Sequence, residues 1–282
     1  EIRLSLVGSE MCIRDSYERA LAVNPSLAGA RYGLGVMQQR RNELEPALRN
    51  LQDAARLSPG NALPWMAMAQ LQRQRGDRQK ALQAYGAALE AQPSYYPARL
   101  ERGQMWLAQE PAKALADFEE AIRQQPRSAE ARVAAGMAQQ LLKRPDAALA
   151  SYQAALQFDP KNVIALNNAA WLASERKGML ANALQWATEA VRLAPGEPAV
   201  LGTLAWVHHR RGDSAKAAAM LQALVQATAP PRAESYYLLG RVHADRSERE
   251  AASAALREAL RIDASFPQAG EAGELLRRLQ GG

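Results

Sequence analysis

Three histidines are the side chains of this chain that most directly suggest chemistry. His208 and His209 are adjacent, and His243 follows further along the chain. Imidazole binds transition metals and acts as an acid or a base near neutral pH. A zinc site needs further ligands at set spacings such as His-x3-His, and the sequence has neither that spacing nor any cysteine besides Cys12.

Other catalytic patterns are absent from the sequence as well. It contains no Gly-rich phosphate loop, no nucleophile elbow and no acidic motif with metal-ligand spacing. We therefore predict that the chain is not an enzyme, binds no metal and needs no cofactor.

The composition predicts that helices position these residues. About a fifth of the 282 residues are Ala, whereas the branched residues Val, Ile and Thr, which fill pleated sheets, are scarce. No stretch approaches the roughly 18 consecutive apolar residues that a membrane helix needs. An all-α chain without a membrane span is the expectation.

Prolines divide the chain at a nearly constant interval. Pro25, Pro59, Pro93, Pro126, Pro160 and Pro195 are spaced 34, 34, 33, 34 and 35 residues apart. Each follows an apolar run such as YGAALEAQP or YQAALQFDP, and proline ends helices because it lacks an amide hydrogen and clashes with the preceding turn. The interval predicts a repeated structural unit that ends at each proline.

Small residues recur in register with the prolines. A small slot in the first helix of each unit holds Gly35, Ala69, Gly103, Gly136, Ala170, Ala205 and Gly240. A slot in the second helix holds Ala47, Ala81, Ala114, Ala148, Ala183, Ala217 and Ala252, and an aromatic slot four residues later holds Tyr85, Phe118 and Tyr152 among others. Small side chains let helix backbones approach closely. With these residues and this period, the chain from about Tyr17 to Phe266 resembles the tetratricopeptide repeat family.

The resemblance implies a right-handed α-solenoid of helix–turn–helix repeats that acts as a protein-interaction scaffold. We predict seven repeats, at 28–61, 62–95, 96–128, 129–162, 163–197, 198–232 and 233–266. A half repeat at 17–27, with a second helix only, precedes them, and a capping helix and tail at 267–282 follow.

The first sixteen residues read EIRLSLVGSEMCIRDS and resemble the translation of a sequencing-library adaptor. We therefore expect residues 1–16, with Cys12, to be a non-native segment that stands outside the fold. The native start would then be missing, so the sequence gives no signal for a compartment.

A binding groove is predicted on the first helices. In the family, the side of these helices opposite the packed slots lines a concave groove, and apolar and amide side chains there suit an extended or helical peptide. The predicted partner-binding residues are Met137, Leu141, Ile164, Asn167, Asn168, Trp171, Trp206, His209, Tyr237 and Arg241. Trp171 and Trp206 each follow the small slot in consecutive repeats, so we expect them side by side on the open face as binding hot spots. The alternative is that some of these residues pack against neighbouring first helices.

Charge bears on the kind of partner. Lys and Arg outnumber Asp and Glu by 35 to 29, and the pI of about 9.6 raises nucleic acid as a partner. The predicted groove face nevertheless holds more carboxylates than guanidiniums: Arg40, Arg210 and Arg241 against Glu101, Glu130, Glu175, Glu234 and Asp245. We therefore predict a protein or peptide partner and no nucleic acid.

Two further hypotheses concern context. The stretch from Asn167 to Asp213, with the FPQAGEAGELLRRL ending, is similar to the C-terminal parts of bacterial envelope-associated tetratricopeptide proteins, including those that accompany exosortase-type sorting and polysaccharide export. This similarity slightly favours the bacterial cell envelope or periplasm as the location. The rival to a scaffold is the repeat arm of a larger enzyme, such as a glycosyltransferase or peptidase, whose catalytic domain lay upstream.

Overall fold

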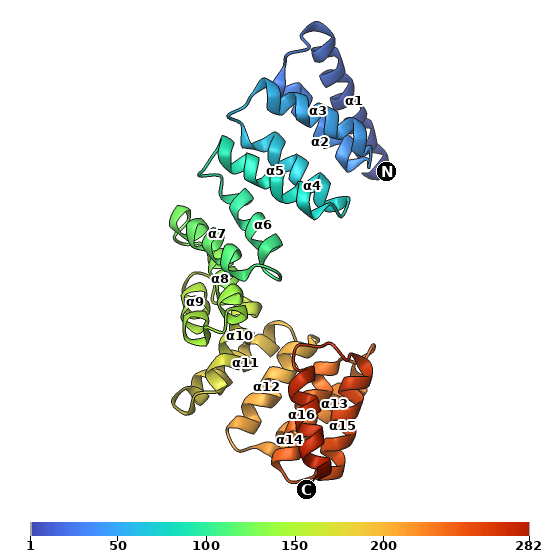
Figure 1. Ribbon diagram of the computed structural model, residues 1–282. Coiled ribbons are helices and arrows are strands. Elements are labelled where there is room, and N and C mark those ends of the chain that lie inside the picture. The colour runs from blue at the N-terminus through green and yellow to red at the C-terminus, as the bar shows by residue number, and fades with distance from the viewer. Residues whose placement is uncertain (1, 282) are drawn as a thin grey trace. The chain divides into compact units, whose positions relative to one another are not determined.

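The computed structural model describes residues 2–281, and the surroundings of their side chains from residue 11 on. All regular elements in this range are helices, as Figure 1 shows. The chain divides into two compact units, residues 1–142 and residues 143–282, and each is described by itself below.

Unit 1 contains the helices α1 (Ile2–Val23), α2 (Ala28–Arg40), α3 (Leu44–Leu57), α4 (Ala62–Gln74), α5 (Arg78–Ala91), α6 (Tyr96–Trp106), α7 (Pro111–Gln124) and α8 (Ala129–Leu141). Each of these helices packs against the next one in the chain. Two consecutive first helices, α2 and α4, also touch directly.

Unit 2 contains α9 (Pro145–Phe158), α10 (Val163–Ser174), the short 3-10 helix η1 (Lys177–Met179), α11 (Leu180–Leu193), α12 (Pro198–Arg210), α13 (Ser214–Ala227), α14 (Ala233–Asp245), α15 (Arg249–Ile262) and α16 (Ala269–Gly281). Each α-helix packs against its neighbour in the chain. The first helices α10, α12 and α14 also contact one another in turn, so their side chains form one surface.

Turn residues explain where the helices end. Gly76 and Gly212, after α4 and α12, have φ values of 76° and 97°, a left-handed conformation that glycine adopts without steric cost. Side-chain caps begin several helices: Asp77 accepts from the amide of Lys80, and Asn162 accepts from the amide of Ala165, at 3.1 and 3.0 Å. Proline or a capping side chain at several starts and a left-handed residue at several ends thus mark the helix boundaries.

The small residues lie where helices approach most closely. All seven alanines of the second-helix slot are fully buried. A Cβ atom added to Gly103 would lie 2.5 Å from the Phe118 ring, and one added to Gly240 would lie 2.8 Å from Leu256 Cγ. The predicted close approach of the backbones is therefore present in the hairpins α6/α7 and α14/α15.

The N-terminal segment differs from the expectation that it stands outside the fold. Residues 2–16 form the first part of α1 and continue into Tyr17 without a break. Ile13 and Tyr17 line a hollow of about 330 Å³ together with Tyr32 and Val36 of α2. The physical reason is that a helix already held by Tyr17–Val23 extends at low cost, since each added residue gains a backbone hydrogen bond. The adaptor origin of the segment stays a prediction.

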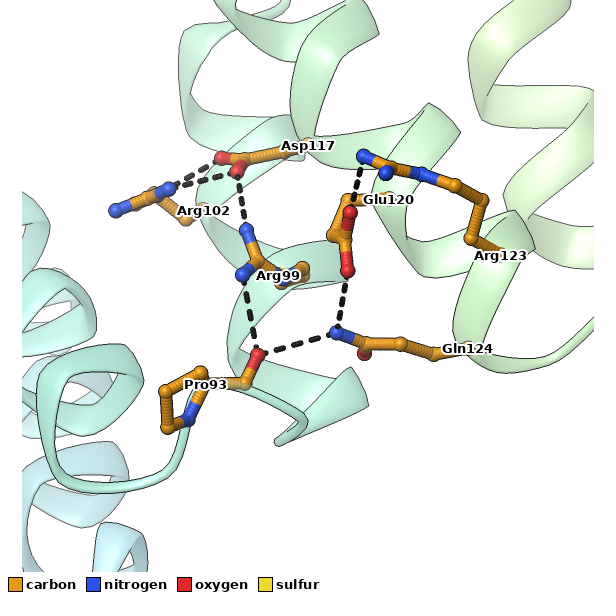
Figure 2. Close-up of polar contacts among 7 residues, drawn as sticks. All are labelled: Pro93, Arg99, Arg102, Asp117, Glu120, Arg123 and Gln124. Carbon is orange, nitrogen blue, oxygen red and sulfur yellow. Dashed lines mark hydrogen bonds and ion pairs between the residues drawn. The ribbon is translucent and has the colours of Figure 1, made fainter.

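A buried carboxylate joins the hairpin α6/α7 (Figure 2). Asp117 of α7 is 5% exposed and receives two hydrogen bonds from Arg102 of α6, at 2.8 Å from Nε and 2.7 Å from Nη2. The hydrogen bond to Asp117 raises the pKa of Arg102. Arg99 approaches the same carboxylate at 3.6 Å and donates to the carbonyl of Pro93 at 3.1 Å. Gln124 also donates to that carbonyl, so the turn before α6 is tied to both helices of the hairpin.

This cluster yields a stability prediction. Removing one partner of a buried ion pair leaves the other charges uncompensated and costs about 3–5 kcal/mol. We expect Asp117→Ala to lower the free energy of unfolding in urea by that amount. The matched control is Asp146→Ala, because Asp146 also pairs with an arginine, Arg176, but its side chain is 91% exposed. Exposed pairs contribute less than about 1 kcal/mol, so equal losses for the two variants would contradict the prediction.

Candidate interaction face

The candidate site is a surface made by the first helices of unit 2 and by α16. Side chains three or four residues apart lie on one side of a helix, and one side of each of these helices contributes. We call this surface the first-helix face and define it by Ile164, Asn167, Asn168 and Trp171 of α10 with its C-cap residue Glu175, Trp206, His209 and Arg210 of α12, Glu234, Tyr237, Arg241 and Asp245 of α14, and Glu271, Glu274 and Arg278 of α16.

A row of rings and one guanidinium crosses three consecutive repeats. The rings of Trp171 and Trp206 are stacked, with centroids 5.7 Å apart and planes 26° apart. The guanidinium of Arg241 lies 4.3 Å from the centroid of the Trp206 ring on the next helix, and 5.8 Å from that of Tyr237. The ring of His209 lies 5.0 Å from that of Trp206. The row holds α10, α12 and α14 together along the first-helix face.

The expectation that Trp206 is an open-face binding residue is wrong. Its side chain is 0% exposed, and its Nε1 donates to the Glu175 carboxylate at 3.0 Å. The physical reason is that the residues equivalent to Trp206 in the repeats before and after it are also large. Trp171 and Arg241 cover the indole from the two sides, so Trp206 is a core residue.

Tyr237 is also buried, contrary to the expectation of a groove residue. It is 3% exposed, and its hydroxyl donates to Glu271 of α16 at 2.6 Å. Burial and, next, the hydrogen bond to Glu271 raise the pKa of Tyr237 to about 12, so the hydroxyl remains a donor near neutral pH. Tyr237 therefore attaches the capping helix to the last repeat.

The predicted residues on α10 lie at the surface. Ile164 is 55% exposed, although it is apolar, and Asn167, Asn168 and Trp171 are partly exposed. Asn168 donates from Nδ2 to the hydroxyl of Tyr152 at 3.3 Å. The Oδ1 atom of Asn167 is buried and has no hydrogen-bond partner within residues 2–281. These four residues form a mixed apolar and amide patch.

Met137 and Leu141 belong to α8 in unit 1. They lie four residues apart on one side of that helix and are 36% and 52% exposed. They are thus surface residues as predicted, but they do not belong to the first-helix face as defined in unit 2.

Each histidine has a hydrogen-bond partner five residues further along the chain. Nδ1 of His208 lies 3.4 Å from Asp213, Nδ1 of His209 lies 2.9 Å from the Ser214 hydroxyl, and Nδ1 of His243 lies 2.5 Å from Glu248. His209 also contacts Asp245 through Nε2 at 2.8 Å. The three contacts at five-residue spacing tie the end of the first helix of a repeat to the start of its second helix. Within residues 2–281, no cluster of three His, Cys, Asp or Glu side chains has the geometry to hold a metal ion.

Sequence reasoning missed a polar link between consecutive repeats. The Tyr85 hydroxyl donates to Glu101 at 2.8 Å, and the Tyr152 hydroxyl receives the bond from Asn168. In both cases a tyrosine of the aromatic slot reaches a polar residue sixteen positions later, in the next first helix. That spacing is visible in the sequence and could have predicted both contacts.

The part that α16 contributes was missed as well. A hollow of about 310 Å³ between α14 and α16 is lined by Tyr237, Arg241, Asp245, Glu271, Glu274, Leu275 and Arg278. Glu271, Glu274 and Arg278 recur at helical spacing, which is the signal that α16 presents one polar side to α14. The capping helix therefore extends the first-helix face.

Comparison with known proteins identifies the class to which this arrangement belongs. The model of the tetratricopeptide repeat family matches residues 66–110, 108–163, 144–198 and 203–269, which together make up most of the chain. The chain belongs to the tetratricopeptide repeat family. No curated protein matches its sequence.

Solved structures share the fold at low identity. A tetratricopeptide repeat protein from Parabacteroides merdae is 21% identical with a TM-score of 0.64, over 94% of this chain and 99% of that one. YrrB, described as a tetratricopeptide protein with an unusual peptide-binding site, is 22% identical with a TM-score of 0.57, over 67% of this chain and 97% of its own. PilW, a type IV pilus biogenesis factor, is 18% identical with a TM-score of 0.57, over 71% of this chain and 93% of its own.

None of the helices between residues 2 and 281 is long and apolar enough to cross a membrane.

The position of Trp206 gives a second stability prediction. Truncating a fully buried tryptophan costs about 3–5 kcal/mol through lost contacts and the cavity left behind. We expect Trp206→Ala to lower the free energy of unfolding by this amount in urea denaturation. Ile164→Ala is the control on the same face and should change stability by about 0.5 kcal/mol or less, because Ile164 is exposed. Comparable losses in the two variants would show that Trp206 is not a core residue.

Proposed function

We propose that the chain is a non-enzymatic interaction module whose first-helix face binds an extended segment of a protein partner. The observation that carries this proposal lies on α10, where the apolar side chain of Ile164 is more than half exposed. Partly exposed Trp171 lies on the same side of the helix, two turns further on. Exposed apolar side chains grouped among polar ones are typical of protein-binding sites.

The amides of α10 support a peptide as the ligand. The side chains of Asn167 and Asn168 are both partly exposed on this side of α10. A side-chain amide can donate to and accept from the backbone of an extended peptide. Asn167 lies one turn before Trp171, so a peptide held by its backbone at Asn167 would place a side chain against the indole ring.

The likeness to YrrB, whose structure is described as having a peptide-binding site, is consistent with this proposal. Because identity to that protein is 22%, the likeness shows the fold alone, and the argument rests on α10.

Nucleic acid is the weaker candidate, because basic residues at the helix turns are engaged within the protein. Arg75 pairs with Glu45 at 2.9 Å, and Lys80 pairs with Asp77 at 2.8 Å. Arg73 pairs with Glu101 at 2.7 Å, on a first helix of unit 1.

A repeat arm of a larger enzyme would use the same face to hold a protein, so the experiment below applies to that alternative equally.

The experiment is selection of a displayed library of random ten-residue peptides on the purified chain. Enriched peptides should bind Ile164→Asp at least about tenfold more weakly, the loss expected when a hot-spot contact is removed. The fold should survive this change, because an acidic residue in the first turn of α10 interacts favourably with the helix dipole.

The matched control is Leu63→Asp on α4, which also replaces an exposed apolar residue near the start of a first helix. It should bind the same peptides as the unaltered chain does. The absence of any enriched peptide, or equal binding by Ile164→Asp, would refute the proposed function.

A further inference from the structure

The charges on the first-helix face are unevenly matched. Arg210 lies 3.6 Å from Glu175, and Arg278 lies 3.7 Å from Glu274, so these two guanidiniums have carboxylate partners. Among the residues that the structure describes, Glu271 has only the Tyr237 hydroxyl as a partner, and Asp245 has only His209. Glu234 is exposed. Within the described chain, no Lys or Arg nitrogen lies at ion-pair distance from Glu234, Asp245 or Glu271.

The positive charge of Arg241 balances only part of the negative charge of these three carboxylates. It contacts the rings of Trp206 and Tyr237 and has no carboxylate partner in the part of the chain that is described. Over the whole first-helix face, five carboxylates stand against three guanidiniums. The face is therefore negative, whereas the formal net charge of the chain is +6.

The negative charge and the apolar patch lie at different ends of the face. Ile164 and Trp171 belong to α10, whereas the three unmatched carboxylates belong to α14 and α16. The hollow between α14 and α16 is lined by Asp245 and Glu271 and is large enough, at about 310 Å³, to admit a long side chain. A ligand that spans the face would meet an apolar surface first and carboxylates beyond it.

The distance between the two ends sets the spacing in the ligand. Packed helices lie roughly 8–10 Å apart, so the two steps from α10 to α14 cover about 16–20 Å. The Glu271 carboxylate of α16 lies 2.6 Å from the Tyr237 hydroxyl of α14, so the same distance applies to it. An extended chain covers about 3.3 Å per residue, so this distance corresponds to about five or six residues.

We propose that the first-helix face of unit 2 binds an extended basic peptide, in which an apolar side chain rests on Ile164 and Trp171 and a lysine or arginine, about five or six residues away, meets the carboxylates of α14 and α16. This inference rests on the proposed function and adds the chemistry of the partner. Charge complementarity selects this occupant over an acidic peptide, which the five carboxylates would repel.

The test uses the composition of the peptides selected from the random library. We expect Lys and Arg to be enriched over Asp and Glu, at five or six positions from an apolar residue. Binding of a synthetic peptide of the enriched sequence, measured by fluorescence anisotropy, should weaken as salt rises from about 0.05 to 0.5 M, because salt screens exposed charges.

The double variant Glu234→Gln/Glu271→Gln tests the assignment to named residues. Glutamine at 271 can still accept the hydrogen bond of Tyr237, so α16 should stay attached. We expect this variant to bind the basic peptide at least about fivefold more weakly, because two charge pairs with the ligand are lost at once. Glu250→Gln on α15, which removes an exposed carboxylate outside the face, should leave the affinity unchanged.

The outcomes separate the two proposals. Enrichment of acidic or uncharged peptides, or full affinity of the double variant for the basic peptide, would overturn the basic-peptide inference and leave the proposed function in place. A library without any enriched peptide would refute the proposed function itself.

Discussion

The buried indole of Trp206 is the contact on which the first-helix face depends. It stacks on Trp171 of the preceding repeat, lies under the guanidinium of Arg241 of the following repeat, and donates its N–H to Glu175. One side chain thus touches all three first helices that form the face. Because these contacts leave Trp206 with no exposed area, the recognition that we propose uses the residues on either side of it, on α10 and on α14 and α16.

The repeat architecture could be predicted from the sequence because its physical cause is local. Proline ends each helix run in the first six units, and alanine or glycine allows close packing wherever two helices must meet. The seven alanines of the second-helix slot are all fully buried, as close backbone approach requires. The register of such residues is fixed by the helix period and needs no knowledge of distant contacts.

The burial of individual face residues could not be predicted in the same way. Trp171 and Trp206 occupy equivalent positions in consecutive repeats, yet one is partly exposed and the other fully buried. Trp206 lies between the ring of Trp171 and the guanidinium of Arg241, which cover its indole from two sides. The helical period predicts on which face a side chain lies. It does not predict how much of that side chain is covered by the side chain at the equivalent position of the next repeat, thirty-five residues away.

Polar contacts between helices also could not be predicted from the sequence, because they depend on single residues of a facing helix. Arg99 and Arg102 read as ordinary exposed arginines in the sequence, but in the structure both approach the buried carboxylate of Asp117. Their role depends on a single aspartate in the facing helix. The role of Glu271 on α16 likewise depends on Tyr237 of α14, because α16 packs where the next first helix of a longer array would lie.

The most direct test of this account is a double-mutant cycle on the free energy of unfolding, with Trp206→Leu, Arg241→Met and the two combined. If the guanidinium covers a desolvated indole, the coupling energy between the two residues should be about 1 kcal/mol or more. If the two changes add within about 0.3 kcal/mol, Arg241 does not hold Trp206 and the row of side chains is not what organises the first-helix face.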